Sequence, residues 1–359
     1  MERNELFKTI NEGKIESVYL FSGPEAYVRR QAERNLIEKL IQPGMDMMNM
    51  NILVSPTVDQ IMESADLFPF MNEYRLVIVR ELPLLGKDSD KSKGKDDGEG
   101  KGKSRNSADD SDRLIEYLSH VPSTTCILFD SGDGFDKRKK VGKYLSGLPG
   151  CVNFAQLEGS ELQKWIQKTV REHGASITAE AGERLVFLSG RDLTALNAEI
   201  EKLTAYAGDG GKIGENEVDL LATRTSEAQV FEMIDALFDG KTEEAFSQTD
   251  RLLKSGESRI GILALITRQI RQLLFAESMN QARRPGSDIA KAVGMSPYFL
   301  KKTLTRSGKI GIAMLRKCLD RCIQTDYDIK RGVLREEAGF ERLMMEMATI
   351  AQRKTGKAL

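Results

Sequence analysis

Apolar residues follow two kinds of spacing along the chain, which indicate an α/β part followed by an all-helical part. Short apolar runs typical of buried strands occur at Val18–Ser22, Tyr74–Val79, Thr125–Phe129 and Val152–Phe154. Segments between these runs carry apolar residues at helical spacing, and alternating strands and helices favour a parallel sheet covered by helices. From residue 158 onwards the spacing is helical throughout. We expect an α/β domain at 1–157, a small helical domain at 158–225 and a larger helical domain at 226–359.

The segment Ser55–Arg80 places large apolar residues where a polar connection is expected. Thr57 followed by Gln60 is a capping-box pattern, which predicts a short amphipathic helix that ends near Asp66. Proline prevents this helix from continuing. Before the next strand lie Leu67, Phe68, Pro69, Phe70 and Met71. These five residues either pack under the sheet or form an exposed apolar surface that inserts into a partner.

The first strand is followed by a glycine turn at Gly23 and a helix at Tyr27–Ile41, the order in which a phosphate-binding loop begins. A working loop has the pattern GxxxxGK[ST], in which backbone N–H groups and the lysine hold the phosphates and the hydroxyl holds magnesium. Counted from Gly23, the pattern places Val28, Arg29 and Arg30 at the second glycine, the lysine and the hydroxyl. None of the three fits, so the loop is degenerate.

The acidic residues that a nucleotide site needs are also missing from the pattern. Arg80 follows the strand that ends at Val79, and Ser131 follows Asp130 where a catalytic glutamate would be required. Asp130 is therefore interpreted as a structural residue. A helical domain behind an α/β domain is the layout of AAA+ proteins, so we expect an AAA+/RecA-like parallel sheet without nucleotide chemistry.

Two polar segments interrupt the first domain. Gly86–Asp112 has almost no residue able to enter a core, which predicts a disordered insertion. Further on, Asp136 is interpreted as the N-cap of a helix whose first turn holds Lys137, Arg138, Lys139 and Lys140. Positive charge is unfavourable at this end of a helix. The four cations are therefore candidates for contact with DNA phosphates or with an acidic face of a neighbouring subunit, besides being simply solvated.

Composition narrows the function classes. Apolar residues make up 40% of the 359 residues, enough for a core in each domain, and the net charge of −1 argues against a protein that coats nucleic acid by charge alone. No apolar run is long enough for a membrane span, and the N-terminus lacks the apolar stretch of a signal peptide, so a cytoplasmic protein is expected. With four unpaired cysteines and two histidines, buried thiols are expected and a metal site is not.

One passage in the C-terminal part indicates a different function. Ile289–Leu304 has the helix, glycine turn and second helix of a DNA-reading helix-turn-helix, with Lys301 and Lys302 available to phosphates. The alternative is a helical hairpin in an assembly domain. A DNA-binding regulator that uses this passage is one alternative function. An active P-loop ATPase is another, which Val28, Arg29 and Arg30 disfavour.

Several segments, taken together in their order and spacing, resemble the delta subunit of the bacterial DNA polymerase III clamp loader. They are VYLFSGPEAYV, LFPFMNEYRLVIV, FDKRKKVGKYL, Ser189–Gly208, IAKAVGMSPYFLKKTL and Leu319–Gly332. The resemblance implies a degenerate AAA+ domain, a helical lid at 158–225 and a helical collar at 226–359. It also implies that the collar joins the ATP-binding gamma/tau and delta prime subunits, that primed DNA is bound within the complex, and that this chain has no cofactor or catalytic residue of its own.

The same resemblance implies that the first domain binds and opens the ring-shaped sliding clamp, the beta subunit. Carried over to this sequence, the family's apolar clamp-binding pair falls at Pro69–Phe70, and Leu67–Phe68 two residues earlier offers a second register. Phe70 is the first choice, followed by Met71, Phe68 and Leu67. The resemblance further interprets Ile289–Leu304 as collar structure.

Overall fold

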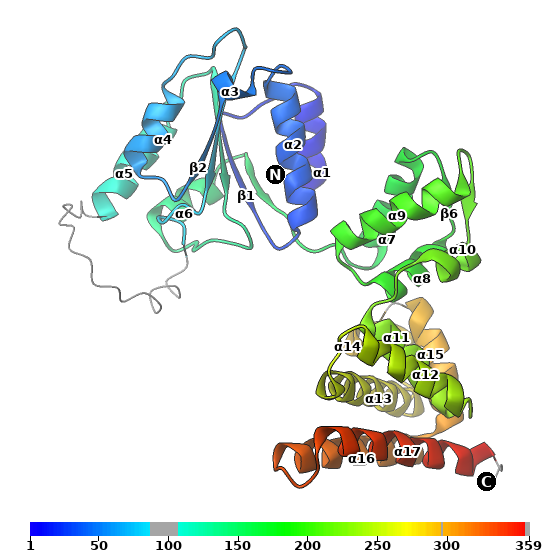
Figure 1. Cartoon of the computed structure of the whole chain (residues 1–359). Helices are drawn as coiled ribbons and strands as arrows, with labels where there is room; N and C mark the ends of the chain where they lie inside the picture. Colours follow the sequence, from blue (N-terminus) through cyan, green and yellow to red (C-terminus); the bar gives the residue numbers. More distant parts are fainter. Residues whose placement is uncertain (87–106, 296, 356–359) are drawn as a thin grey trace. The chain divides into compact units, whose positions relative to one another are not determined.

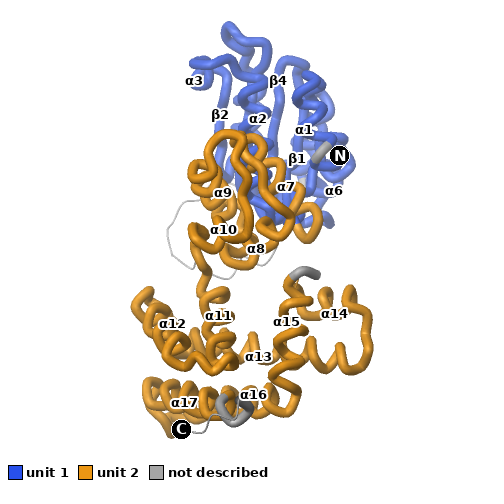
Figure 2. The backbone as a smooth tube through the Cα atoms, turned by 90° about the vertical axis from the view of Figure 1, so that its right-hand side faces the viewer, with its two compact units in different colours: residues 1–157 blue, residues 158–359 orange. Residues whose placement is uncertain are grey.

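The computed structural model of the chain describes residues 1–86, 107–295 and 297–355. It divides into two compact units, Met1–Leu157 and Glu158–Leu359 (Figure 2). Among the described residues, no helix combines the length and the apolar character needed to cross a membrane. The further division of the second unit into a lid and a collar stays a prediction.

The first unit is built on a five-stranded, all-parallel sheet with the order β2-β3-β4-β1-β5. The strands are β1 Val18–Ser22, β2 Met50–Val54, β3 Arg75–Arg80, β4 Thr125–Asp130 and β5 Cys151–Asn153. The sequence pattern missed β2, because this strand lies at the sheet edge and leaves Ile52 and Val54 exposed. The other four strands are confirmed within one or two residues at each end.

Helices cover both faces of this sheet (Figure 1). One face carries α1 Arg3–Asn11 and α2 Ala26–Leu40, and the other carries α4 Val58–Ala65, α5 Ser107–Leu118 and α6 Lys140–Ser146. A short helix, α3 Asp46–Asn49, leads directly into β2. Between the sheet and α4 to α6, a core of fully buried side chains includes Ile61, Val77, Leu114, Ile127 and Phe129.

The helix α5 begins earlier than the composition indicates. Residues 107–112, expected to be part of the disordered insertion, are helical in the structure, and the expectation for 87–106 lies outside the described residues. Asp109 and Asp110 stand in the first turn, where the helix dipole favours negative charge. Arg113 then pairs with Asp59 of α4 at 2.6 Å, which ties the two helices together.

The helix α6 begins later than predicted, at Lys140, and Asp136 is not its N-cap. The Asp136 carboxylate instead accepts hydrogen bonds from the backbone N–H of Arg138 at 2.9 Å and from its guanidinium at 2.8 and 3.0 Å. Such a local side-chain bond stabilises a turn in competition with the helix. Lys137, Arg138 and Lys139 therefore precede the helix and do not form its first turn.

The second unit begins with four helices, α7 Gly159–Glu172, α8 Ala179–Ser189, α9 Leu193–Ala207 and α10 Glu215–Leu221. Thr178 and Asp192 cap α8 and α9 through their side chains. The expectation of helices alone is wrong in one detail. Two-residue strands, β6 Ser176–Ile177 and β7 Lys212–Ile213, pair in parallel, and they are too short to show a spacing pattern.

The rest of this unit consists of α11 Ser226–Phe238, α12 Thr242–Lys254, α13 Arg259–Gln281, α14 Gly286–Val293, α15 Pro297–Ile310, α16 Ile312–Lys330 and α17 Glu336–Thr355. The long helix α13 contacts α11 and α14 to α17. Cys318 and Cys322 of α16 are buried in this core, and burial raises the pKa of each thiol to about 12. Cys126 is also buried, whereas Cys151 is only partly covered, contrary to the expectation of four buried thiols.

Candidate functional site

The turn after β1 has the path of a phosphate-binding loop, but its polar groups are paired within the chain. Gly23 has φ +120°, and an added Cβ would lie 2.4 Å from the carbonyl oxygen of Phe154, so only glycine fits. The backbone N–H of Gly23 donates to Gly132 O at 2.9 Å, and that of Glu25 donates to Phe154 O at 3.0 Å. Two N–H groups near the start of this turn are therefore already used.

Arg29 occupies the space beside this turn. Its Nη1 donates to the carbonyl of Gly23, and its Nε lies 2.8 Å from the carboxylate of Asp130 at the end of β4. Both side chains are largely buried. Val28 is buried in the core and Arg30 is exposed. Arg29, at the position of the P-loop lysine, thus forms a buried ion pair with Asp130 at the carboxyl ends of the strands.

The predicted apolar surface lies in the loop between α4 and β3, at the amino-terminal ends of the strands (Figure 1). The helix α4 ends at Ala65, after the expected capping box between Thr57 and Gln60. In the loop that follows, the exposed fractions are 88% for Phe68, 72% for Met71, 56% for Phe70 and 55% for Leu67. Pro69 is half-buried. These side chains do not pack under the sheet.

A buried asparagine fixes the backbone of this loop. Asn49, at the end of α3, has no exposed surface. Its Oδ1 accepts the backbone N–H of Phe70 at 2.6 Å, and its Nδ2 donates to the carbonyls of Phe70 at 3.0 Å and Met45 at 3.2 Å. Both backbone polar groups of Phe70 are satisfied from inside the protein, which leaves its ring outside.

Two further polar side chains hold the ends of the loop. Arg75 at the start of β3 is buried, and its guanidinium donates to Ser64 O of α4 at 2.6 Å, to Met48 O of α3 at 2.9 Å and to the side chain of Asn51. Asn72 donates to Leu40 O at 2.8 Å. The loop therefore has a defined path, although its apolar side chains are exposed.

The four candidate cations before and in α6 have contacts within the chain. Lys139 donates to Gly86 O at 2.6 Å, Lys140 pairs with Asp112 at 2.8 Å, and Arg138 pairs with Asp136 at 2.8 Å. Lys137 lies 6.0 Å from the ring centre of Phe135. Exposed ion pairs of this kind are weak and exchange readily, so these contacts do not prevent binding of an anion.

The contact between Asp136 and Arg138 predicts a measurable titration. Hydrogen bonds from the Arg138 side chain, followed by its backbone N–H, lower the pKa of Asp136 from its ordinary 3.8 to about 2. The carboxylate therefore stabilises the fold above its ordinary pKa, and this contribution is lost as the pH falls from 3.8 towards 2. We expect Arg138→Ala to raise the pKa part of the way back, because the backbone N–H remains. Carboxyl ¹³C shifts followed against pH measure it, and an unchanged pKa would contradict the assignment.

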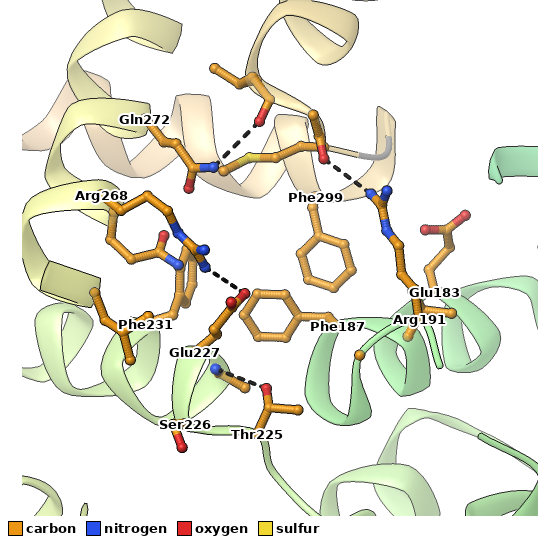
Figure 3. A pocket seen from close by; sticks show the side chains of 18 of the residues that line it. Glu183, Phe187, Arg191, Thr225, Ser226, Glu227, Phe231, Arg268, Gln272 and Phe299 are labelled. Atoms are coloured by element: carbon orange, nitrogen blue, oxygen red, sulfur yellow. Dashed lines mark hydrogen bonds and ion pairs between the residues drawn. The ribbon is translucent and has the colours of Figure 1, made fainter. Parts of the chain in front are cut away.

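The helix-turn-helix passage is docked on neighbouring helices. The ring of Phe299 in α15 stacks on Phe187 of α8, with centroids 4.3 Å apart, and Phe231 of α11 meets Phe187 edge-on at 4.9 Å (Figure 3). These rings line a cavity of about 920 Å³. Lys302 pairs with Glu215 of α10 at 3.3 Å, and Arg191 donates to Gly294 O at 3.0 Å. These contacts favour packing over DNA reading.

Comparison with known proteins agrees with this geometry. A family model described as "DNA polymerase III, delta subunit" matches residues 19–154, and one described as "DNA polymerase III delta subunit, C-terminal domain" matches residues 227–347. Together they cover more than half of the chain. The chain belongs to the DNA polymerase III delta subunit family.

One relative of the delta family matches nearly the whole length of the chain, and another matches about half of it. The DNA polymerase III subunit delta of Bacillus subtilis is 25% identical over 96% of both chains, and the probable subunit delta of Aquifex aeolicus is 27% identical over 54% of this chain and 56% of its own. A solved structure, the Bacillus subtilis DNA clamp loader delta protein, matches with a TM-score of 0.58 at 23% identity, covering 97% of this chain and 99% of that chain. This structure supports the α/β and helical fold.

Within this delta-family chain, sequence reasoning found the exposed loop but missed the residues that hold it. Asn49 contacts Phe70 across 21 residues of sequence, and Arg75 contacts Ser64 and Met48 across 11 and 27 residues, so no local pattern reveals them. The one local signal for these residues was a polar side chain at the end of an apolar strand, and an ordinary exposed turn has such side chains as well.

Proposed function

We propose that this chain is the clamp-loader delta subunit of its DNA polymerase III, and that the apolar loop Leu67–Met71 binds the sliding clamp and favours its open form. The exposure of Phe68, Phe70 and Met71 on a backbone held by Asn49 is the observation that supports this proposal. Exposed apolar residues gathered in one place usually mark an interaction site. A fixed backbone reduces the entropy that binding would otherwise cost.

Binding alone does not open a ring. A ligand shifts an equilibrium between two states only by the difference in its affinity for them, so the loop must bind the open or distorted clamp more tightly than the closed one. Full burial of a Phe or Leu side chain contributes ~1.5 to 3 kcal/mol, and two or three such residues give ~3 to 9 kcal/mol before the cost of association. That range is large enough to bias a strained interface.

The proposal assigns no ATP hydrolysis to this chain. Arg29 and Asp130 fill the degenerate site with a buried ion pair, and the N–H groups of Gly23 and Glu25 are used internally. Control would come from the ATP-binding gamma/tau and delta prime subunits, joined through the helices after residue 226. Contact of Lys137, Arg138, Lys139 or Lys140 with primed DNA or a neighbouring subunit is part of this proposal, as is a cytoplasmic location with the replication machinery.

Retention of the clamp by the isolated chain tests the main proposal. We expect the beta clamp encoded by the same genome to co-purify with this chain alone, because the loop is exposed without a partner. Adding the ATP-hydrolysing subunits should make retention depend on ATP. If the chain fails to hold the clamp both alone and in the complex, the proposal is wrong.

A separate measurement tests the absence of nucleotide chemistry. We expect calorimetric titration with magnesium-ATP to give no binding tighter than about 1 mM, because the site's own groups already satisfy one another. The gamma/tau subunit under the same conditions is the positive control. Saturable binding of ATP, or release of phosphate by the purified chain, would contradict this proposal and favour the active P-loop ATPase.

A further inference from the structure

Two exposed methionines lie beside the clamp-binding loop. Met47 and Met48 belong to the short helix α3, and their exposed fractions are 96% and 61%. Single exposed apolar residues are common on protein surfaces and need no explanation. Here two consecutive exposed methionines stand on a helix that is hydrogen-bonded to a loop with four other exposed apolar side chains, and such a gathering of exposed apolar residues is uncommon.

Hydrogen bonds fix α3 against the loop at two points. The residue after Met48 is Asn49, whose side chain binds both backbone polar groups of Phe70. The carbonyl of Met48 itself accepts a 2.9 Å hydrogen bond from Arg75, where the loop enters β3. A partner that binds at Phe70 therefore also approaches α3.

We propose that Met47 and Met48 form a second part of the clamp-binding surface, beside Leu67–Met71. This inference rests on the proposed function and adds residues to it. Methionine suits this place because its flexible, polarizable side chain adapts to a partner surface that changes shape. A clamp whose interface opens presents such a surface, so the rigid aromatic rings provide the anchor and the methionines follow the distorted edge.

Clamp binding by matched variants tests the inference. Met47→Ala/Met48→Ala is compared with Met345→Ala in α17, a methionine that is 62% exposed far along the chain. We expect the double variant to bind the beta clamp at least fivefold more weakly, with Met345→Ala unchanged. All three residues are exposed, so circular dichroism should show an intact fold in every variant.

Methyl NMR spectra distinguish direct contact between the methionines and the clamp from an indirect structural effect of the substitutions. With ¹³C-methyl-labelled methionine, the Met47 and Met48 signals should shift or broaden on addition of the clamp, whereas the Met345 signal should not. If the double variant binds like the wild-type chain while Phe68→Ala/Phe70→Ala binds weakly, the inference is overturned and the proposed function stands. Full binding by the phenylalanine variant would overturn the proposed function and this inference with it.

Discussion

Replacing Phe68 and Phe70 together by alanine should weaken clamp binding about 100-fold or more. Both rings are largely exposed in the free chain, at 88% and 56%, so their burial by a partner removes a large apolar area from water. At ~1.5 to 3 kcal/mol for each fully buried ring, the two changes together correspond to at least two powers of ten in affinity. Surface plasmon resonance with immobilised clamp gives the dissociation constants directly.

Phe275→Ala provides the matched control for this experiment. Phe275 in α13 is 50% exposed, a fraction similar to the 56% of Phe70, and it belongs to the second unit. Its replacement should leave clamp binding unchanged. The single variants Phe68→Ala and Phe70→Ala decide which of the two residues is the main clamp contact. The sequence favours Phe70, whereas Phe68 has the larger exposed fraction. Wild-type affinity in the double variant would remove the loop from the interface.

Arg29→Ala should destabilise the first unit by about 3 to 5 kcal/mol, the usual cost of removing one partner from a buried ion pair. The side chains of Arg29 and Asp130 are only 10% and 15% exposed, so truncation leaves a carboxylate with little access to water. The carbonyl of Gly23 loses its donor as well. Urea denaturation of the full chain, followed by far-UV circular dichroism, measures the loss.

The single tryptophan of the chain separates the two units in this experiment. Trp165 lies in α7 of the second unit, so its fluorescence reports unfolding there. We expect Arg29→Ala to shift the circular dichroism transition more than the fluorescence transition. The double variant Arg29→Ala/Asp130→Ala should lose less than the sum of the two single variants, because no charge is then left unpaired. A loss below about 1 kcal/mol in Arg29→Ala would contradict the burial argument.

Local chemistry explains which elements the sequence predicts. The capping box of Thr57 acts within one turn of its helix, and it is found where expected. Thr178 and Asp192 cap α8 and α9 by the same local rule. The start of α6 was predicted wrongly for an equally local reason. Asp136 has the chemistry of an N-cap, but its carboxylate binds the side chain and N–H of Arg138 instead.

The exposed loop shows where local reasoning ends. Leu67–Met71 has the same composition whether it packs under a sheet or faces solvent, and only the complete fold decides between the two. Asn49 binds the backbone of Phe70 across 21 residues, and Arg75 joins the start of β3 to Ser64 and Met48 across 11 and 27 residues. The sequence therefore predicted the candidate residues of the surface, while the residues that fix its shape required the structure.

The exposed loop Leu67–Met71 and the degenerate turn lie at opposite ends of the strands of one parallel sheet. The loop precedes β3 at the amino edge, and Gly23 and Asp130 stand at the carboxyl edges of β1 and β4. Substitutions at such separated positions act additively when they share no contact. Substitutions in the loop and at the turn can therefore be combined with predictable effects, and the two regions can be engineered separately.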